Sequence, residues 1–164
     1  MVQKILISKI LFYLILIFNF SVLAQEKIEG NARVIDGDTI HIGKIKIRLH
    51  GIDAPEKNQK CFISDNDWNC GKESTNNLIR LINLKKINCR ILGRDKYKRY
   101  IGECYVNNIN INKWMVQNGW ALAYRYYSRD YVQDENIAKK NKKGVWQGSF
   151  ENPWEFRKKN NKIL

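Results

Sequence analysis

The sequence lacks several features that would assign it to a familiar class. It has no internal repeat and no low-complexity linker, and 164 residues suffice for one domain with a hydrophobic core. Its four cysteines form no C-x-x-C pair, so a structural zinc site fits poorly. The acidic residues are not spaced as in an EF-hand loop. No serine or cysteine arrangement indicates a covalent nucleophile.

Acidic residues are also scarce relative to basic ones. Asp and Glu number 16 against 29 Lys and Arg, which gives a formal net charge of +13. A positive field attracts polyanions and speeds their encounter, and this favours nucleic acid, anionic lipid or another acidic polymer as a partner. The alternative is a compositional bias toward Lys and Asn that says nothing about a partner.

The first 24 residues are typical of a secretory signal. Lys4 and Lys9 precede an apolar run that ends in small residues at Ala24, after which we expect cleavage. Cleavage would leave residues 25–164 with a formal charge of +11. The charge-free run has 15 residues, fewer than the roughly 20 of a membrane-spanning helix. We therefore predict a secreted or periplasmic domain without stable membrane insertion; the alternative is an uncleaved segment that tethers it to the envelope.

All four cysteines lie in the part predicted to be exported, where the compartment permits disulfides. Four cysteines allow three pairings. Cys89 and Cys104 are nearly symmetric about the "DKYKR" turn and can face each other across a hairpin. That leaves Cys61 with Cys70, and we predict these two bridges.

Short apolar runs broken by turns predict strands in "IEGNARVIDGDTIHIGKIKIRLHGID" and a hairpin in "INCRILGRDKYKRYIGECYV". In "KIKIRLH" the apolar residues Ile45, Ile47 and Leu49 share one face of a strand. Because side chains alternate along a strand, Arg48 points to the opposite face.

Three helices are predicted. One follows Gly71 in "KESTNNLIRLINLKK", one lies in "NINKWMVQNG" with Asn110 as its cap and Gly119 as its terminator, and one runs from about Asp130 to Gly144. The order of strands, helix, hairpin, helix and helix predicts an α+β domain in which about five strands close into a small barrel.

Four carboxylates lie where predicted strands begin or end. Asp36 and Asp38 in "VIDGDTI" can face the same side, although an Asp-Gly pair alone indicates only a turn. Asp53 and Glu56 in "RLHGIDAPE" flank Pro55, which restricts the backbone around it. Two such carboxylates with a backbone carbonyl are the hard oxygen donors that Ca²⁺ prefers.

Arg48 and Arg99 complement these acids. A phosphodiester under attack gains negative charge on its equatorial oxygens, and guanidinium groups bind such oxygens in pairs. The alternative is that each arginine is merely solvated, which is the stronger alternative for Arg99 because it lies between lysines in a turn.

Four blocks in order, "VIDGDTI", "RLHGIDAPE", "DKYKR" and "INKWMVQNGWALAYRY", resemble the staphylococcal nuclease (thermonuclease) family from about Arg33 to Trp146. This resemblance implies an OB-fold, a five-stranded β-barrel with three α-helices. It also implies a Ca²⁺-dependent, sugar-nonspecific nuclease that hydrolyses DNA and RNA to 3′-phosphate and 5′-hydroxyl ends. Nothing in the sequence indicates an oligomer, so we expect a monomer.

The resemblance also implies roles for individual residues. Asp38 and Asp53 resemble the calcium carboxylates, and the carbonyl of Ala54 resembles the third protein ligand. Glu56 is similar to the general base, and the arginines on the scissile phosphate are represented by Arg48 and Arg99.

Three further positions match the family pattern by resemblance. Asp36 is similar to an acid that lies near the calcium ligands, and Tyr124 and Tyr126 resemble the tyrosines of the nucleotide pocket. Lys98 stands where the family turn has glycine, so a positive φ there would strain the loop that carries Arg99. The rival function is a noncatalytic OB-fold module that binds nucleic acid or another polyanion, which would have no need for carboxylates facing a phosphate.

Overall fold

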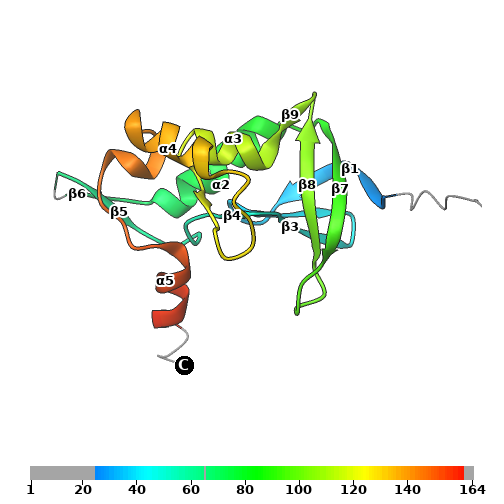
Figure 1. Cartoon of the computed structure of the whole chain (residues 1–164), viewed down its shortest axis with the longest axis horizontal. Helices are drawn as coiled ribbons and strands as arrows, with labels where there is room; N and C mark the ends of the chain where they lie inside the picture. The colour runs from blue at the N-terminus through cyan, green and yellow to red at the C-terminus, as the bar shows by residue number, and fades with distance from the viewer. Residues whose placement is uncertain (1–24, 65, 161–164) are drawn as a thin grey trace, which may run out of the picture.

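The computed structural model describes residues 25–64 and 66–160 (Figure 1). The predicted signal, residues 1–24, lies outside the described residues. Within the described ranges, no helix combines the length and the apolar character needed to cross a bilayer.

Five strands form a closed barrel. Neighbouring strands pair antiparallel in the order β3-β2-β1-β7-β8, and a parallel pairing between β3 and β8 closes the sheet. The barrel strands are β1 (Lys27–Val34), β2 (Thr39–Ile42), β3 (Ile45–Leu49), β7 (Lys86–Arg94) and β8 (Tyr100–Val106). A short strand, β9 (Ile109–Asn110), extends the sheet beyond β8. This topology confirms the predicted five-stranded OB-fold barrel.

The barrel interior is apolar because side chains alternate along each strand. In β3 the side chains of Ile47 and Leu49 are buried, whereas Lys46 is exposed and Arg48 is only partly covered. Cys89 and Cys104 are directly opposite each other on β7 and β8 and form a disulfide with a Cα–Cα distance of 4.0 Å. The predicted pairing across the hairpin is therefore confirmed.

The three predicted helices are present as α2 (Cys70–Ile82), α3 (Ile111–Gln117) and α4 (Val132–Lys140). The side chain of Asn110 caps α3 by accepting a hydrogen bond of 2.9 Å from the backbone N–H of Lys113. Gly119 follows α3 with a φ of 70°, as expected of a helix terminator.

Among the residues that the structure describes, it adds a 3₁₀ helix, η1 (Gly144–Gln147), and a further α-helix, α5 (Pro153–Asn160). Pro153 suits the first turn of a helix, and the carbonyl of Asn152 accepts hydrogen bonds from Glu155 and Phe156. Eight residues are too few for a stable isolated helix, so α5 depends on packing that no local pattern reveals.

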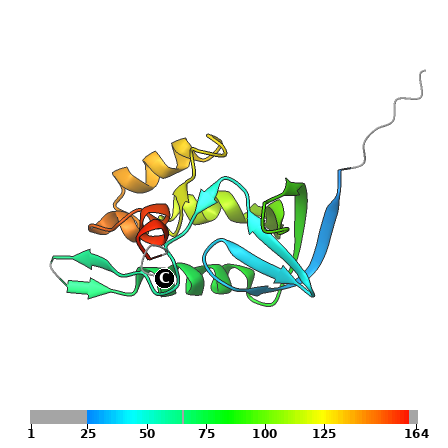
Figure 2. The ribbon, with the colours of Figure 1, turned by 90° about the horizontal axis from the view of Figure 1, so that it is seen from below.

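Two small pairings link the barrel to the helices. The second disulfide joins Cys61 to Cys70, with a Cα–Cα distance of 5.6 Å, and confirms the other predicted bridge. It ties α2 to a hairpin of β5 (Cys61–Ile63) and β6 (Asn66–Trp68), which projects away from the barrel (Figure 2). Nearby, β4 (Ile52–Asp53) pairs with β10 (Leu122–Ala123).

Candidate active site

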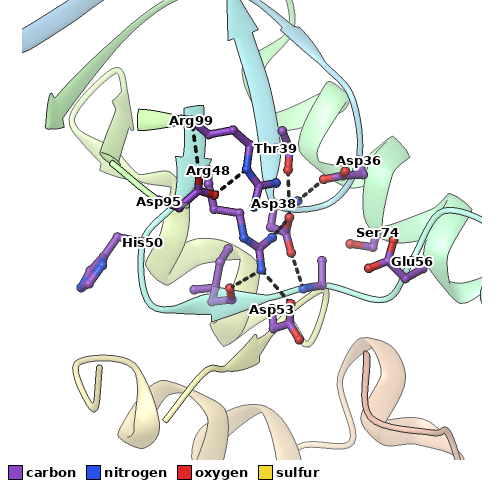
Figure 3. A network of polar contacts seen from close by, with 12 residues as sticks. Asp36, Asp38, Thr39, Arg48, His50, Asp53, Glu56, Ser74, Asp95 and Arg99 are labelled. Carbon is purple, nitrogen blue, oxygen red and sulfur yellow. Dashed lines mark hydrogen bonds and ion pairs between the residues drawn. The ribbon is translucent and has the colours of Figure 1, made fainter. Parts of the chain in front are cut away.

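The candidate site forms where β2 begins and β4 ends, beside the C-terminal end of β3 (Figure 3). The backbone N–H of Leu49 donates to the carbonyl of Asp38 at 2.8 Å, which joins the two strand ends. Gly51 has a φ of 70° and turns the chain from β3 into β4. These contacts place Asp38 and Asp53 on either side of Arg48, as Figure 3 shows.

Arg48 connects the two aspartates predicted to bind calcium. Its Nη1 forms an ion pair with Asp38, and its Nη2 donates a hydrogen bond of 2.7 Å to the Oδ1 of Asp53. Asp38 is 4% exposed and Asp53 is fully buried. Burial lowers the pKa of Arg48, and the charge of Asp53 opposes that effect.

The turn that carries Asp38 is fixed on both sides. The Oδ1 of Asp36 accepts a hydrogen bond of 3.1 Å from the backbone N–H of Asp38. The Oδ2 of Asp38 accepts one of 2.8 Å from the backbone N–H of Ala54. Burial raises the pKa of the Asp36 carboxyl, although hydrogen bonds with Thr39 and the charge of Arg48 oppose it. Asp36 thus orients the backbone of Asp38, and the backbone of residue 54 lies against the Asp38 carboxylate.

Arg99 is held in the β7–β8 turn by Asp95. Its Nε donates a hydrogen bond of 2.7 Å to Asp95 Oδ2, and its backbone N–H donates one of 3.0 Å to Asp95 Oδ1. Burial raises the pKa of Asp95, but the Arg99 hydrogen bonds outweigh burial and hold it below its ordinary value. Lys98 has a φ of 62°, the left-handed conformation that the resemblance implied. Arg99 is therefore positioned and is not simply a solvated side chain.

Glu56 lies on the other side of Asp53, on a short turn closed by Gln59. The backbone N–H of Gln59 donates to the Glu56 carbonyl at 2.7 Å, and the Gln59 side chain accepts from the Glu56 N–H at 3.1 Å. Gln59 is fully buried and also donates to the carbonyl of Glu151 at 2.6 Å. The backbone of Glu56 is thus fixed while its carboxylate reaches the site.

A third arginine reaches the site from α5. Arg157 donates hydrogen bonds of 2.9 Å to each carboxylate oxygen of Asp53 and one of 2.8 Å to Glu56 Oε1. Burial lowers its pKa, but the hydrogen bonds and charges of Asp53 and Glu56 outweigh burial and raise it above the ordinary arginine value. Sequence analysis missed this residue, because its only signal was a basic tail of unspecified role.

A hollow of about 440 Å³ opens beside Arg48 and Arg99, and Tyr124 and Tyr127 contribute to its wall. The two tyrosines share this wall because residues 124–127 form a tight turn, in which the N–H of Tyr127 donates to the carbonyl of Tyr124 at 3.0 Å. Tyr126 is 81% exposed and instead lines a neighbouring hollow of about 350 Å³ with Trp154. Tyr126, which the resemblance assigns to the nucleotide pocket, thus lines the neighbouring hollow, while Tyr127 shares the first hollow with Tyr124.

The oxygen atoms at the site are of the chemical type that a hard divalent cation binds. Asp38 and Asp53 supply carboxylate oxygens, and the backbone N–H of Ala54 donates to Asp38 Oδ2 at 2.8 Å, which places the peptide of residue 54 beside these carboxylates. Across residues 25–64 and 66–160, no group of three or more His, Cys, Asp or Glu side chains is arranged to hold a metal ion. Two carboxylates and a carbonyl are the set that the sequence predicts, and Ca²⁺ accepts such oxygen donors together with water.

Comparison with known proteins adds an independent finding. The profile of the family described as "Staphylococcal nuclease homologue" matches residues 46–148. The match includes Arg48, Asp53, Glu56 and Arg99, whereas Asp38 and α5 lie outside it.

Three curated relatives illustrate the similarity. The chain is 35% identical over 132 residues to "Succinoglycan biosynthesis protein ExoI" of Rhizobium meliloti, covering 78% of this chain and 69% of that protein. It is 33% identical to "Probable staphylococcal-like nuclease CAN3" of Oryza sativa, covering 74% of this chain but 30% of the rice protein. It is 34% identical over 152 residues to an "Uncharacterized endonuclease" of Escherichia coli O157:H7, covering 87% of this chain and 94% of that protein.

Proposed function

The chain belongs to the staphylococcal nuclease homologue family, and on that premise we propose that it is a Ca²⁺-dependent, sugar-nonspecific nuclease. Its substrates are DNA and RNA, and its products carry 3′-phosphate and 5′-hydroxyl ends. One observation carries this proposal: Arg48 connects two buried aspartates beside Glu56, at the wall of a hollow that Arg99 also lines.

In this mechanism Glu56 orients a water molecule and accepts its proton as the oxygen attacks phosphorus in line. The bond to the 5′ oxygen breaks, and that oxygen takes up a proton to leave as a hydroxyl. Glu56 is suited to this task because Gln59 fixes its backbone while its side chain is one-third exposed. A side chain with this access reaches substrate without a rearrangement of the barrel.

Arg48 and Arg99 bind the phosphoryl oxygens as negative charge accumulates on them. The bond to Asp95 uses the Nε of Arg99, which leaves the terminal nitrogens for the phosphate. Calcium bound by Asp38, Asp53 and the carbonyl of Ala54 would add Lewis-acid stabilisation of the same charge. Phosphoryl transfer depends mostly on positioning and charge, so no covalent intermediate is required.

Tyr124 and Tyr127 offer aromatic surface for a nucleobase in the same hollow as the two arginines. Burial raises the pKa of Tyr124, and the nearby charge of Asp53 adds to that effect, so its phenol stays protonated and can donate to a phosphate. The net positive charge of the chain would attract either nucleic acid.

We also propose that the protein acts outside the cytoplasm, secreted or periplasmic, as a monomer. Two disulfides support this location, because such bridges persist in oxidising compartments. The layout of residues 1–24 supports export. Mass spectrometry of the mature N-terminus tests it: a chain that begins at Gln25 agrees with export, and retention of Met1 contradicts cleavage.

Digestion of single-stranded DNA and of RNA by residues 25–164 tests the nuclease proposal. We expect cutting with Ca²⁺, none with excess chelator, and a loss of at least about 10²-fold in rate for Glu56→Gln. Glu29→Gln, an exposed site on β1, is the matched control and should retain full activity. Tight, salt-sensitive binding without cleavage in any divalent metal would instead identify a binding module.

A further inference from the structure

Helix α5 places two side chains on the proposed active site. Arg157 bonds Asp53 and Glu56, and Trp154 stacks on Tyr124 with ring centroids 5.7 Å apart and an interplanar angle of 16°. Both side chains follow residue 148, the last residue matched by the family profile. The contact between α5 and the site is therefore carried by this chain's own C-terminal segment.

Arg157 and Arg48 together occupy most of the hydrogen-bonding capacity of Asp53. The carboxylate has about four lone-pair positions. Arg157 uses two of them through bonds of 2.9 Å, and Arg48 uses another through its bond of 2.7 Å. Both positions on Oδ1 are taken and one on Oδ2 is left, so a divalent cation that binds both oxygens of Asp53 would have to replace at least one of these guanidinium contacts.

The formal charges favour replacement of Arg157. Asp38, Asp53 and Glu56 with Arg48 and Arg157 carry one net negative charge. A divalent cation would make this buried cluster net positive if Arg157 stayed, and neutral if Arg157 left. Arg48 lies between both aspartates and is mostly covered, whereas the Arg157 side chain is 34% exposed on a terminal helix.

The chain is anchored up to the first residue of α5, so only the part of the helix after Pro153 needs to move. Gln59 holds the carbonyl of Glu151 at 2.6 Å, and Pro153 is buried. Beyond Pro153, α5 contacts the site through Trp154 and Arg157. Rotation of the chain after Pro153 would withdraw both side chains together.

We propose that Arg157 is a tethered cation that competes with the divalent metal for Asp53, so that α5 is a latch that leaves the site when the metal binds. This inference rests on the proposed calcium dependence. The closed latch lowers the apparent metal affinity, because only the open fraction of molecules binds. It also covers one face of Tyr124, a wall of the substrate hollow, so metal binding and opening of the nucleotide site are linked.

Calcium titration by calorimetry tests the competition without relying on activity. The mature chain is compared with Arg157→Gln and with Lys158→Gln, which removes the same charge from an exposed neighbouring position. We expect Arg157→Gln to bind Ca²⁺ about tenfold more tightly, within the usual range of coupling between sites, and Lys158→Gln to stay within about twofold of the parent. Arg157→Lys keeps the charge but loses the bidentate contact, so its Ca²⁺ affinity should lie between those of the parent chain and Arg157→Gln.

Hydrogen exchange gives a second readout. Ca²⁺ should increase amide exchange in residues 153–160 of the parent chain, and this increase should be absent in Arg157→Gln, in which the latch is already released. The latch would be overturned if Arg157→Gln bound Ca²⁺ with the same affinity as Lys158→Gln, or more weakly. It would also be overturned if Ca²⁺ did not change amide exchange in α5 of the parent chain. Either result would leave the nuclease proposal intact. Absence of Ca²⁺ binding in every variant would instead remove the proposed calcium dependence, and the latch with it.

Discussion

Gly71, in the first turn of α2, lies directly against Glu56: a Cβ placed on Gly71 would stand 1.7 Å from the carbonyl oxygen of Glu56. The absence of a side chain at Gly71 therefore lets α2 pack against the turn that carries the proposed general base. The glycine is required here for close approach, since its φ lies outside the left-handed region.

We predict that Gly71→Ala slows cleavage by about 10-fold to 10²-fold, because the new methyl group must displace Glu56 and a shift of about 1 Å in a catalytic group has effects of that size. Steady-state cleavage of single-stranded DNA by the folded variant measures this. Lys72→Ala, at the exposed next position, should cut at the parent rate. Full activity in Gly71→Ala would show that the turn can adjust.

Lys98→Gly should stabilise the protein by about 0.5–1 kcal/mol. Lys98 has a φ of 62°, which costs an L-residue about 1–2 kcal/mol of steric strain. Glycine avoids this strain, and its larger loss of backbone entropy on folding cancels only part of the gain. The turn is closed by a bond of 3.0 Å from the Lys98 N–H to the Asp95 carbonyl, so the conformation is set by its neighbours. Thermal unfolding should show a rise of a few degrees. Lys96→Gly in the same turn should lower the midpoint, and a fall for Lys98→Gly would contradict the prediction.

Glu135→Gln should destabilise the protein by about 2 kcal/mol at pH 7, with a smaller penalty in acid. The buried Glu135 carboxylate accepts hydrogen bonds from Arg125 at 2.5 Å and from Lys139 at 2.9 Å. Burial raises its pKa, but these bonds outweigh burial and hold it below the ordinary 4.5. A depressed folded-state pKa stabilises the fold above the unfolded value, and this stability is lost as pH falls through the folded value.

Urea unfolding between pH 7 and pH 3.5 checks this prediction. The difference between parent and Glu135→Gln should shrink below about pH 4.5, the ordinary value for glutamate. Glu29→Gln, on the exposed side of β1, should show no such difference at any pH. A penalty that stays constant down to pH 3.5 would mean that the carboxylate charge contributes nothing.

Replacing Cys89 and Cys104 together by alanine should cost about 3 kcal/mol. The bridge closes a loop with a sequence separation of 15, and a loop of that length contributes roughly this much through the entropy of the unfolded chain. Both cysteines are fully buried in the barrel core, so the lost sulfur atoms add a packing cost. Denaturant unfolding of the double variant measures the loss, and a change under about 1 kcal/mol would contradict it.

Local patterns predicted those parts of the site that lie on regular strands. The alternation in β3 placed Arg48 opposite Ile47 and Leu49, because side chains of a strand alternate with a fixed period of two. The same regularity put Cys89 opposite Cys104 across the hairpin. The five-stranded barrel followed from strand and turn signals together with the matched blocks.

The tyrosines beside the two hollows lie on a turn, outside the regular strands and helices. The resemblance named Tyr124 and Tyr126 without a local conformation for them, and in the structure residues 124–127 form a turn in which the Tyr127 N–H donates to the Tyr124 carbonyl. Three-residue spacing therefore brings Tyr124 and Tyr127 to one wall, and Tyr126 lines the neighbouring hollow with Trp154. Likewise the sequence did not distinguish a solvated Arg99 side chain from one held in place. In the structure its Nε donates to Asp95, so the side chain is held in place.

The barrel, the helices α2 to α4, both disulfides and the acids and arginines near the strand ends could be predicted from the amino-acid sequence. These depend on periodicity, turn chemistry and short motifs, all of which act over a few residues. The contact of Arg157 with Asp53, 104 positions earlier in the chain, became apparent from the three-dimensional fold alone. An eight-residue helix with a basic end has no local signal for its partner; its place is set by the burial of Pro153, the stacking of Trp154 and the attraction of a buried carboxylate for a guanidinium.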